Sequence, residues 1–320
     1  DTVELSDLDA KASEENKAIS LIRGTLSRFV QKGHAVGSFD AYTTSNVLKG
    51  SGLSSSAAFE VLVGTILSHL YNEGSVDAVE IAKYAQYAEN VYFGKPSGLM
   101  DQMASSVGSV ITIDFADTEN PIIEKIDFDM EAMGCALCIV DVGGNHADLT
   151  HEYAAIPTEM KEVAGFFGRD VLRGVSYREL IANASRIRAQ FGDRAFLRAV
   201  HFVKENERVG AIVNALRDKD YPCFLKLVTQ SGDSSYRYLQ NVYAASDPKE
   251  QSMAVALEMA EDLLGGRGAY RVHGGGFGGT TQNFVPFDLL DSFRSGIESV
   301  FGEGSCHVLS IRPLGGVQVL

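Results

Sequence analysis

The chain has few cysteines for its length of 320 residues, and they lie far apart. Four cysteines, Cys135, Cys138, Cys223 and Cys306, are too few and too scattered for the disulfide framework of a small secreted protein. Cys135 and Cys138 form a C-x-x-C pair, but they lie in an apolar run that is typical of a buried strand. We therefore expect core packing for them rather than a redox pair or half of a zinc site.

Basic residues are also in the minority. The 28 Lys and Arg residues against 42 Asp and Glu residues give a formal net charge of −14. Nucleic-acid binders rely on clustered cations that displace counterions from phosphates, so the composition argues against a general DNA or RNA partner. An acidic protein can still hold a phosphate group through backbone amides and a metal ion.

Long apolar runs are missing as well. No run reaches the ~18–20 residues of a membrane-spanning helix, and no signal-peptide pattern opens the chain. The expectation is a cytoplasmic protein without a membrane partner. Because the chain opens at Asp1 without a methionine, we also expect residues upstream. The apolar share of 45% excludes a disordered chain, since it supplies enough surface to bury.

Apolar periodicity predicts helices and strands in both halves of the chain. Helices are expected over residues 14–30, 57–71, 76–91, 151–166, 177–190, 194–217, 221–228 and 248–264. Strands are expected over residues 39–47, 110–115, 122–128, 135–142, 269–273, 281–285 and 307–311, with a helix between the last two. This mixture favours an α+β fold over a regular βαβ array. Gly143 and Gly144 mark the expected boundary between domains of residues 1–145 and 146–320.

The most informative stretch is G-S-G-L-S-S-S-A-A, which begins at Gly50 and leads into an apolar-periodic helix. Free backbone N–H groups and the positive helix end would meet at one point there, which suits an anion such as phosphate. Serine hydroxyls could add donors or bind Mg²⁺ through oxygen. The alternative is an ordinary serine-capped helix. The loop is neither a Walker A loop nor a nucleophile elbow.

A second glycine-rich stretch runs from Gly274 to Gly279 and matches G-x-G-x-x-G. The residues after it are strand-like rather than helical, so the context is wrong for a dinucleotide fingerprint. A hairpin between two strands and a close approach to nucleotide phosphates both remain open.

Two carboxylates, Glu89 and Asp101, flank a Gly/Pro loop. Phosphoryl transfer to a hydroxyl needs a hard-oxygen metal ligand and a carboxylate directed at the attacking O–H. Both residues could face one cleft. Alternatively, Glu89 is a solvated helix residue and Asp101 a helix cap.

Three segments together resemble the galactokinases, in the GHMP small-molecule kinase superfamily. They are residues 50–58, the G-L-M-D-Q segment that contains Asp101, and residues 274–279. Residues 201–208 and 231–236 are similar to later galactokinase segments, so the resemblance covers nearly the whole chain in colinear order. It implies an α+β, two-domain GHMP kinase fold with a ribosomal-protein-S5-like N-terminal domain and a ferredoxin-like C-terminal domain.

The resemblance also implies a reaction, in which ATP with Mg²⁺ phosphorylates the anomeric hydroxyl of galactose to galactose 1-phosphate. The residues implied to wrap the ATP phosphates are Gly50, Ser51, Gly52, Leu53, Ser54, Ser55 and Ser56. Ser56 and Glu89 would bind Mg²⁺, Asp101 would be the base on the sugar hydroxyl, and Tyr153 would contact the sugar. Residues 154–158 lack the arginines usual after that tyrosine.

One family motif, G-R-x-N-L-I-G-E-H-T-D-Y, does not occur among these residues. In the family it carries a catalytic arginine and the groups that read the sugar hydroxyls. We therefore expect an N-terminally incomplete galactokinase whose 320 residues are inactive alone. The alternatives are a galactokinase-like non-catalytic sensor of sugar and ATP, or a kinase for a related sugar such as N-acetylgalactosamine. The intact serines and Asp101 favour a kinase over a sensor.

Overall fold

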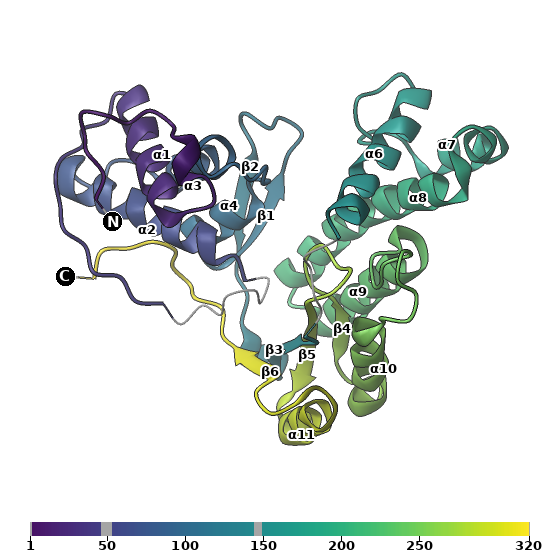
Figure 1. Ribbon diagram of the computed structural model, residues 1–320. Helices are drawn as coiled ribbons and strands as arrows, with labels where there is room; N and C mark the ends of the chain where they lie inside the picture. The colour runs from purple at the N-terminus through teal and green to yellow at the C-terminus, as the bar shows by residue number, and fades with distance from the viewer. Residues whose placement is uncertain (1, 46–52, 144–148, 320) are drawn as a thin grey trace. The chain divides into compact units, whose positions relative to one another are not determined.

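The computed structural model describes residues 2–45, 53–143 and 149–319 (Figure 1). The chain forms two compact units: unit 1 comprises Asp1–Ile126 and Ile311–Leu320, and unit 2 comprises Asp127–Ser310. This division differs from the boundary expected at residue 145, because strand β3 (Cys135–Asp141) is hydrogen-bonded into the sheet of unit 2. The final segment of the chain, in turn, rejoins unit 1.

Unit 1 combines a group of helices with a small sheet. Its elements are η1 (Ala12–Glu14), α1 (Ala18–Gln31), α2 (Ser55–Tyr71), α3 (Ala78–Tyr87), the π-helical turn η2 (Ala88–Phe93), α4 (Met100–Val107), β1 (Val110–Asp114) and β2 (Ile122–Ile126). Strands β1 and β2 pair antiparallel, with Val110 opposite Ile126. Helices α1, α2 and α3 share one apolar core, which includes Phe29, Leu67 and Ile81.

The helix expected over residues 57–71 is confirmed as α2, and the helix expected over residues 76–91 is present as α3 continued by η2. The strand expected over residues 39–47 is wrong for its described part. Residues 39–45 join no strand ladder among the described residues, and residues 46 and 47 lie outside them. A β-branched and aromatic run becomes a strand only when a neighbouring strand accepts its hydrogen bonds.

Unit 2 is built from one sheet and two groups of helices. Its elements before the second strand are α5 (Met130–Met133), β3, α6 (Thr150–Phe166), α7 (Tyr177–Ala182), α8 (Ala184–Arg217), α9 (Tyr221–Ser234), η3 (Ser235–Leu239) and α10 (Ser252–Leu264). The remaining elements are β4 (Ala269–Val272), β5 (Thr280–Pro286), η4 (Phe287–Leu289), α11 (Leu290–Phe301) and β6 (Cys306–Leu309). Helix α8 is interrupted at Gly192, whose φ of 88° and ψ of 171° are not helical, and its part after this break corresponds to the helix expected over residues 194–217. The helix expected over residues 177–190 is divided between α7 and the first part of α8.

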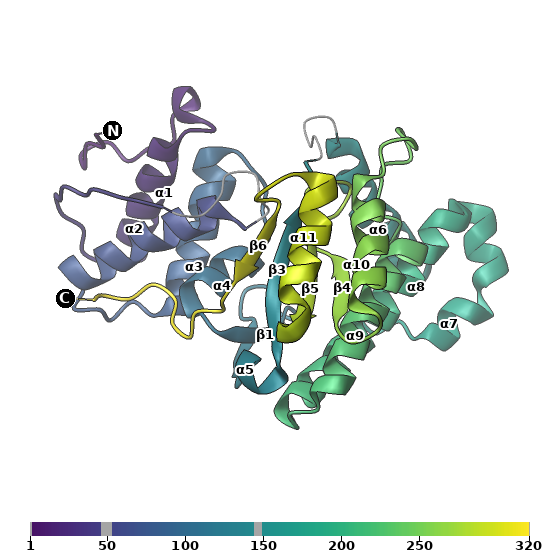
Figure 2. The same ribbon diagram turned by 90° about the horizontal axis from the view of Figure 1, so that it is seen from below.

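The sheet of unit 2 has the strand order β4-β5-β3-β6 with every neighbouring pair antiparallel. A strand, helices, two strands, a helix and a final strand in this order form the ferredoxin-like β-α-β-β-α-β arrangement. The C-terminal domain type implied by the resemblance is therefore present. Figure 2 shows α10 and α11 lying together over this sheet.

The core of unit 2 lies between the sheet and these two helices, and includes Cys138, Val140, Phe293 and Ile297. Cys135 and Cys138 are buried and have free thiols, which confirms their expected place in the core. Among the described helices, none combines the length and the apolar character that crossing a bilayer requires.

Candidate active site

The serine loop leads into α2 through a residue with unusual backbone geometry. Ser54 precedes the helix with φ 54° and ψ 56°, the left-handed region that a non-glycine residue adopts at a cost. Its hydroxyl donates to Asp101 Oδ2 at 2.5 Å. This contact ties the loop to α4, because Asp101 is the second residue of that helix. Ser55 begins α2 and is exposed, and Leu53 lies just before Ser54. Gly50, Ser51 and Gly52 lie outside the described residues.

Ser56 holds the second carboxylate at the same end of α2. Its hydroxyl donates to Glu89 Oε1 at 2.9 Å, and the Lys95 ammonium lies 3.2 Å from the same oxygen. Glu89 is buried on η2, where the wider helical turn carries it toward α2 and α4. The interpretation of Glu89 as a solvated helix residue is therefore wrong.

Glu89 is held in its charged form. Burial raises its pKa, but hydrogen bonds from Ser97 and Ser56 and the nearby Lys95 ammonium outweigh burial, so the pKa lies below its usual range. An ionised carboxylate with a serine hydroxyl beside it is a hard-oxygen pair, the ligand type that Mg²⁺ prefers.

A second buried glutamate lies next to Glu89. The Gln102 side-chain amide donates to Glu89 Oε2 at 2.6 Å and to Glu60 Oε2 at 3.2 Å. Burial and the charge of Glu89 raise the pKa of Glu60 to about 8, against the opposing hydrogen bond from Gln102. Glu60 is thus protonated near neutral pH while its neighbour is charged, which is the usual outcome when two carboxylates share a dry site.

Sequence reasoning missed Glu60, Gln102 and Lys95. Glu60 could have been noticed in the sequence, because it is a charged residue among the apolar residues of α2, one helical turn after Ser56. A charged residue is unusual at such a buried position. Gln102 and Lys95 adjoin or fall within segments already singled out, but their roles depend on contacts between separate helices. Among the described residues, no group of three or more His, Cys, Asp or Glu side chains could hold a metal ion alone.

Tyr153 lies in unit 2, on α6, and packs against the glycine-rich stretch. Its hydroxyl donates to the Gly276 carbonyl at 2.7 Å, and its ring meets Phe277 edge-on with 5.2 Å between centroids. Gly276 also lies close to Asn241: a Cβ added to Gly276 would lie 2.0 Å from the backbone carbonyl oxygen of Asn241. This stretch joins β4 to β5, as expected of a hairpin, and its glycines allow Tyr153 and Asn241 to approach closely.

Residues 20–109 match the family described as the GHMP kinases N terminal domain. The chain is 32% identical over 301 residues to a galactokinase of Streptomyces coelicolor, a match that covers 94% of this chain and 75% of that protein. A galactokinase of Haemophilus influenzae is 32% identical over 288 residues, which cover 88% of this chain and 70% of the other.

Solved structures share the fold. A Lactococcus lactis galactokinase crystallised with galactose superposes with a TM-score of 0.77 at 23% identity, over 99% of this chain and 80% of the other. A Streptococcus pneumoniae phosphomevalonate kinase superposes with a TM-score of 0.59 at 13% identity, over 94% of this chain and 84% of the other. With identity above 30% across most of its length to galactokinases, the chain belongs to the galactokinase family of GHMP kinases.

Proposed function

We propose that the protein is an ATP-dependent galactokinase, which transfers the γ-phosphate of ATP to the anomeric hydroxyl of galactose and releases galactose 1-phosphate and ADP. Family membership supports the reaction. The single observation that carries the proposal is the pair of serine–carboxylate contacts at the start of α2, Ser54 with Asp101 and Ser56 with Glu89. They place two chemically different carboxylates beside one helix N-terminus.

The helix N-terminus supports the binding of ATP phosphates. The first N–H groups of α2 have no partner within the helix, and the positive end of the helix dipole favours an anion. We assign the triphosphate to Gly50, Ser51, Gly52, Leu53, Ser54, Ser55 and Ser56. We also propose that the reaction takes place in the cytoplasm, where ATP is available.

We assign Mg²⁺ to Ser56 and Glu89. The residues fit such an ion, because Glu89 is ionised and the Ser56 hydroxyl lies beside its Oε1. The Lys95 ammonium is the cation that now neutralises this oxygen. Because the Lys95 side chain is 60% exposed, it can move into solvent when Mg²⁺ binds the oxygen. Mg²⁺ commonly uses one or two protein oxygens together with substrate phosphates, and when bound it neutralises charge on the phosphates.

Asp101 is the proposed base. It is exposed at the start of α4 and accepts only a serine hydroxyl among the contacts described for it, so its carboxylate can turn to the hydroxyl of a sugar. A carboxylate in this position would orient the attacking O–H and take its proton as the bond to phosphorus forms. Tyr153 is proposed to contact the sugar, on the strength of the family pattern alone.

The test is an ADP-release assay on the full-length protein, using MgATP and galactose, glucose or N-acetylgalactosamine in parallel. We expect ADP release with galactose and much less with the other two sugars. Preference for N-acetylgalactosamine would identify a kinase for a related sugar. Binding of galactose and ATP without ADP release would identify a non-catalytic sensor and contradict the proposal.

A further inference from the structure

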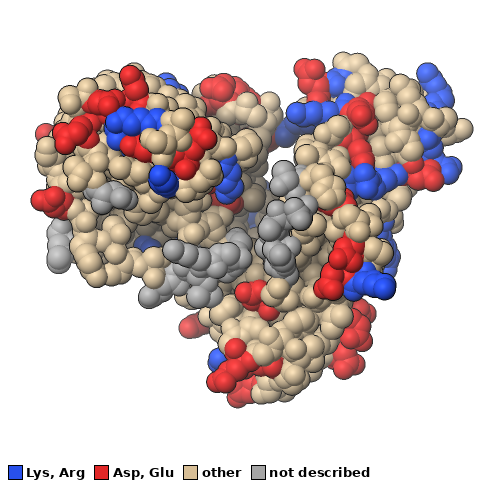
Figure 3. Space-filling model, viewed as in Figure 1, with Lys and Arg blue, Asp and Glu red and all other residues tan. Residues whose placement is uncertain are grey.

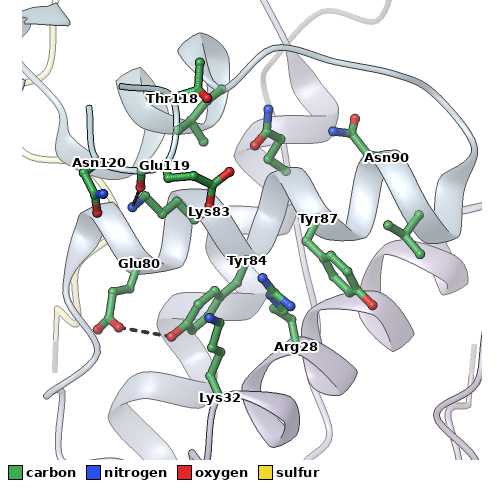
Figure 4. A pocket seen from close by; sticks show the side chains of 13 residues that line it. Arg28, Lys32, Glu80, Lys83, Tyr84, Tyr87, Asn90, Thr118, Glu119 and Asn120 are labelled. Carbon is green, nitrogen blue, oxygen red and sulfur yellow. Dashed lines mark hydrogen bonds between the residues drawn. The ribbon is translucent and has the colours of Figure 1, made fainter. Parts of the chain in front are cut away.

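Unit 1 contains a second pocket whose lining includes none of the residues assigned to the galactokinase reaction. It has a volume of about 570 Å³ and lies between α1, α3 and the turn that joins β1 to β2 (Figure 4). We call it the α1–α3 pocket. The residues that matter for its chemistry are Arg28, Lys32, Lys83, Glu80, Tyr84 and Tyr87.

Two cations enter this pocket from one face of α1. Arg28 and Lys32 are one helical turn apart, a spacing at which like charges repel each other. Neither forms a salt bridge with a carboxylate among the residues the structure describes. Figure 4 shows Lys32 extending toward the Tyr84 ring and the Arg28 guanidinium between the rings of Tyr84 and Tyr87. An anion bound between the two side chains would attract both and would offset their mutual repulsion.

Arg28 is held ready for such an anion. Its guanidinium carbon lies 4.4 Å from the centre of the Tyr87 ring, and Nη1 donates to the neutral Gln31 side chain at 3.1 Å. Its Nε is buried and has no hydrogen-bond partner within the described part of the chain. A ligand in the pocket cannot reach this buried nitrogen, so an anion would bind the terminal Nη groups of the guanidinium instead. A stacked guanidinium is also well suited to bind phosphate oxygens with two N–H groups.

The rest of the lining suits hydroxyl groups. Glu80 accepts the Tyr84 hydroxyl at 3.1 Å and keeps a second carboxylate oxygen, while Glu119 and Asn120 line the opposite side (Figure 4). Lys83 donates to the Glu119 backbone carbonyl, so it fixes that side of the pocket. Carboxylates and amides are the groups that accept hydrogen bonds from a polyol, and tyrosine rings pack on its C–H faces.

A cationic pocket is notable because acidic residues dominate the molecule. The formal net charge is −14, and Figure 3 shows Asp and Glu side chains spread over the visible face of each unit. Three cations against two carboxylates therefore give this pocket the sign opposite to that of the whole chain.

We propose that the α1–α3 pocket binds a phosphate monoester of a small polyol. Arg28 and Lys32 hold the phosphate group, and Glu80 with the β1–β2 turn accepts hydrogen bonds from the hydroxyl groups. The proposal does not depend on the kinase activity, because none of these residues belongs to the serine loop, the Glu89 pair or Asp101. Free phosphate shares the charged half of the chemistry, so the experiment separates the two ligands.

The test is calorimetric titration of the 320-residue chain with glucose 6-phosphate, inorganic phosphate and glucose, each in saturating MgADP so that the serine loop is occupied. We expect glucose 6-phosphate to bind more tightly than inorganic phosphate, and glucose not to bind. Equal affinity for both phosphates would mean that the pocket takes a free anion, and the polyol part of the proposal would be wrong. No binding of either, or binding only when MgADP is left out, would overturn the proposal.

Variants then locate the binding. Arg28→Gln and Lys32→Gln should each weaken glucose 6-phosphate binding by about tenfold or more, since each removes a charged hydrogen bond to phosphate. Lys32 is exposed, so its variant is expected to fold normally, which circular dichroism checks. Arg186→Gln is the matched control, because Arg186 is also stacked on an aromatic ring, 4.9 Å from the centre of Phe166 in unit 2. Equal loss of affinity in this control, or no loss in either pocket variant, would contradict the assignment.

Discussion

Gln102 holds two buried glutamates whose charge states differ. The pKa of Glu60 rises to about 8 through burial and the charge of Glu89, whereas the pKa of Glu89 lies below its usual range. The proton on Glu60 keeps a second negative charge away from the proposed Mg²⁺ ligand. One amide group can therefore contact both carboxyl groups without leaving two charges side by side.

This arrangement predicts how stability depends on pH. Folded Glu60 keeps its proton up to a pH of about 8, whereas the unfolded chain releases it near the ordinary value of 4.5. The free energy of unfolding should therefore fall as pH rises through this window, by at most about 1.4 kcal/mol per pH unit. Glu89 acts in the opposite sense, and its contribution is lost only as the pH falls below its ordinary pKa.

Urea denaturation at a series of pH values across this window measures the slope. Glu60→Gln should flatten it, because glutamine is neutral throughout. Glu15→Gln, at an exposed position in unit 1, is the control and should keep the wild-type slope. An unchanged slope in Glu60→Gln would show that Glu60 is charged in the folded protein.

Asp101 provides the second prediction at this scale. Asp101→Asn keeps the shape of the side chain but removes the proton acceptor, so kcat should fall by roughly 10²–10⁴. The KM for galactose should change less. The measurement is steady-state ADP release by the full-length protein, and Asp9→Asn is an exposed control. Retention of more than about a tenth of wild-type turnover would exclude Asp101 as the base.

The third prediction at the residue scale concerns Glu89. Glu89→Ala should raise the Mg²⁺ concentration needed for half-maximal rate more than it raises the KM for galactose, because a metal ligand acts on the nucleotide side. Titration of Mg²⁺ at fixed ATP and galactose measures the difference. Equal changes in both quantities would indicate a purely structural role for Glu89.

At the scale of elements, η2 is positioned by an unusually close contact with α1. A Cβ on Gly24 would lie 2.8 Å from both Cα and Cβ of Ala88, the first residue of η2. The π-helical turn that carries Glu89 therefore packs directly on the α1 backbone. A turn of this kind often occurs at functional sites because it redirects side chains.

Gly24→Ala should consequently destabilise the protein by about 1–3 kcal/mol, since the new methyl group must push η2 away. Gly210→Ala is the matched control, because Gly210 is also inside a helix but its Cβ would meet nothing within 4 Å. It should stabilise the protein by about 0.5–1 kcal/mol through helix propensity. Thermal unfolding of the two variants measures whether each substitution lowers or raises the stability of the protein. Stabilisation by Gly24→Ala would mean that η2 moves freely.

The elements also show what the sequence could predict. Helix α2 and strand β3 could be predicted because each is a run rich in apolar residues, long enough for a helix in α2 and short enough for a buried strand in β3, which is buried from Cys135 to Val140. The run at residues 39–45 could not be predicted in the same way, since a strand also needs a partner that local sequence does not reveal. Glu89 and Asp101 could be proposed from residue type, but the contacts of Glu60, Gln102 and Lys95 arise only when α2, η2 and α4 meet.

At the scale of the whole molecule, the end of the chain completes unit 1. The Ser109 N–H donates to the Arg312 carbonyl at 2.7 Å. A Cβ on Gly315 would lie 1.9 Å from the Ser106 carbonyl oxygen, so the final segment lies directly against α4. Unit 2 is thus inserted between two parts of unit 1.

Removal of residues 311–320 should loosen unit 1 selectively. Amide hydrogen exchange in α4 and β1 should accelerate by roughly tenfold or more, because contacts there are lost. The sheet of unit 2 should keep its protection, since β6 ends at Leu309, before the deletion. Equal acceleration in β3 and β5 would show that the two units unfold together. No acceleration in α4 would show that the final segment contributes no stability.

The insertion has a consequence for biosynthesis. A ribosome releases the chain from the N-terminus, so helices α1 to α4 emerge long before the segment that lies against α4. Unit 2 is continuous and can fold as soon as Ser310 has left the exit tunnel, whereas unit 1 must wait until residues 311–320 have also emerged. The unit that carries the proposed nucleotide site is therefore started before unit 2 and completed after it, and until residues 311–320 emerge the surface of α4 stays open to chaperones and proteases.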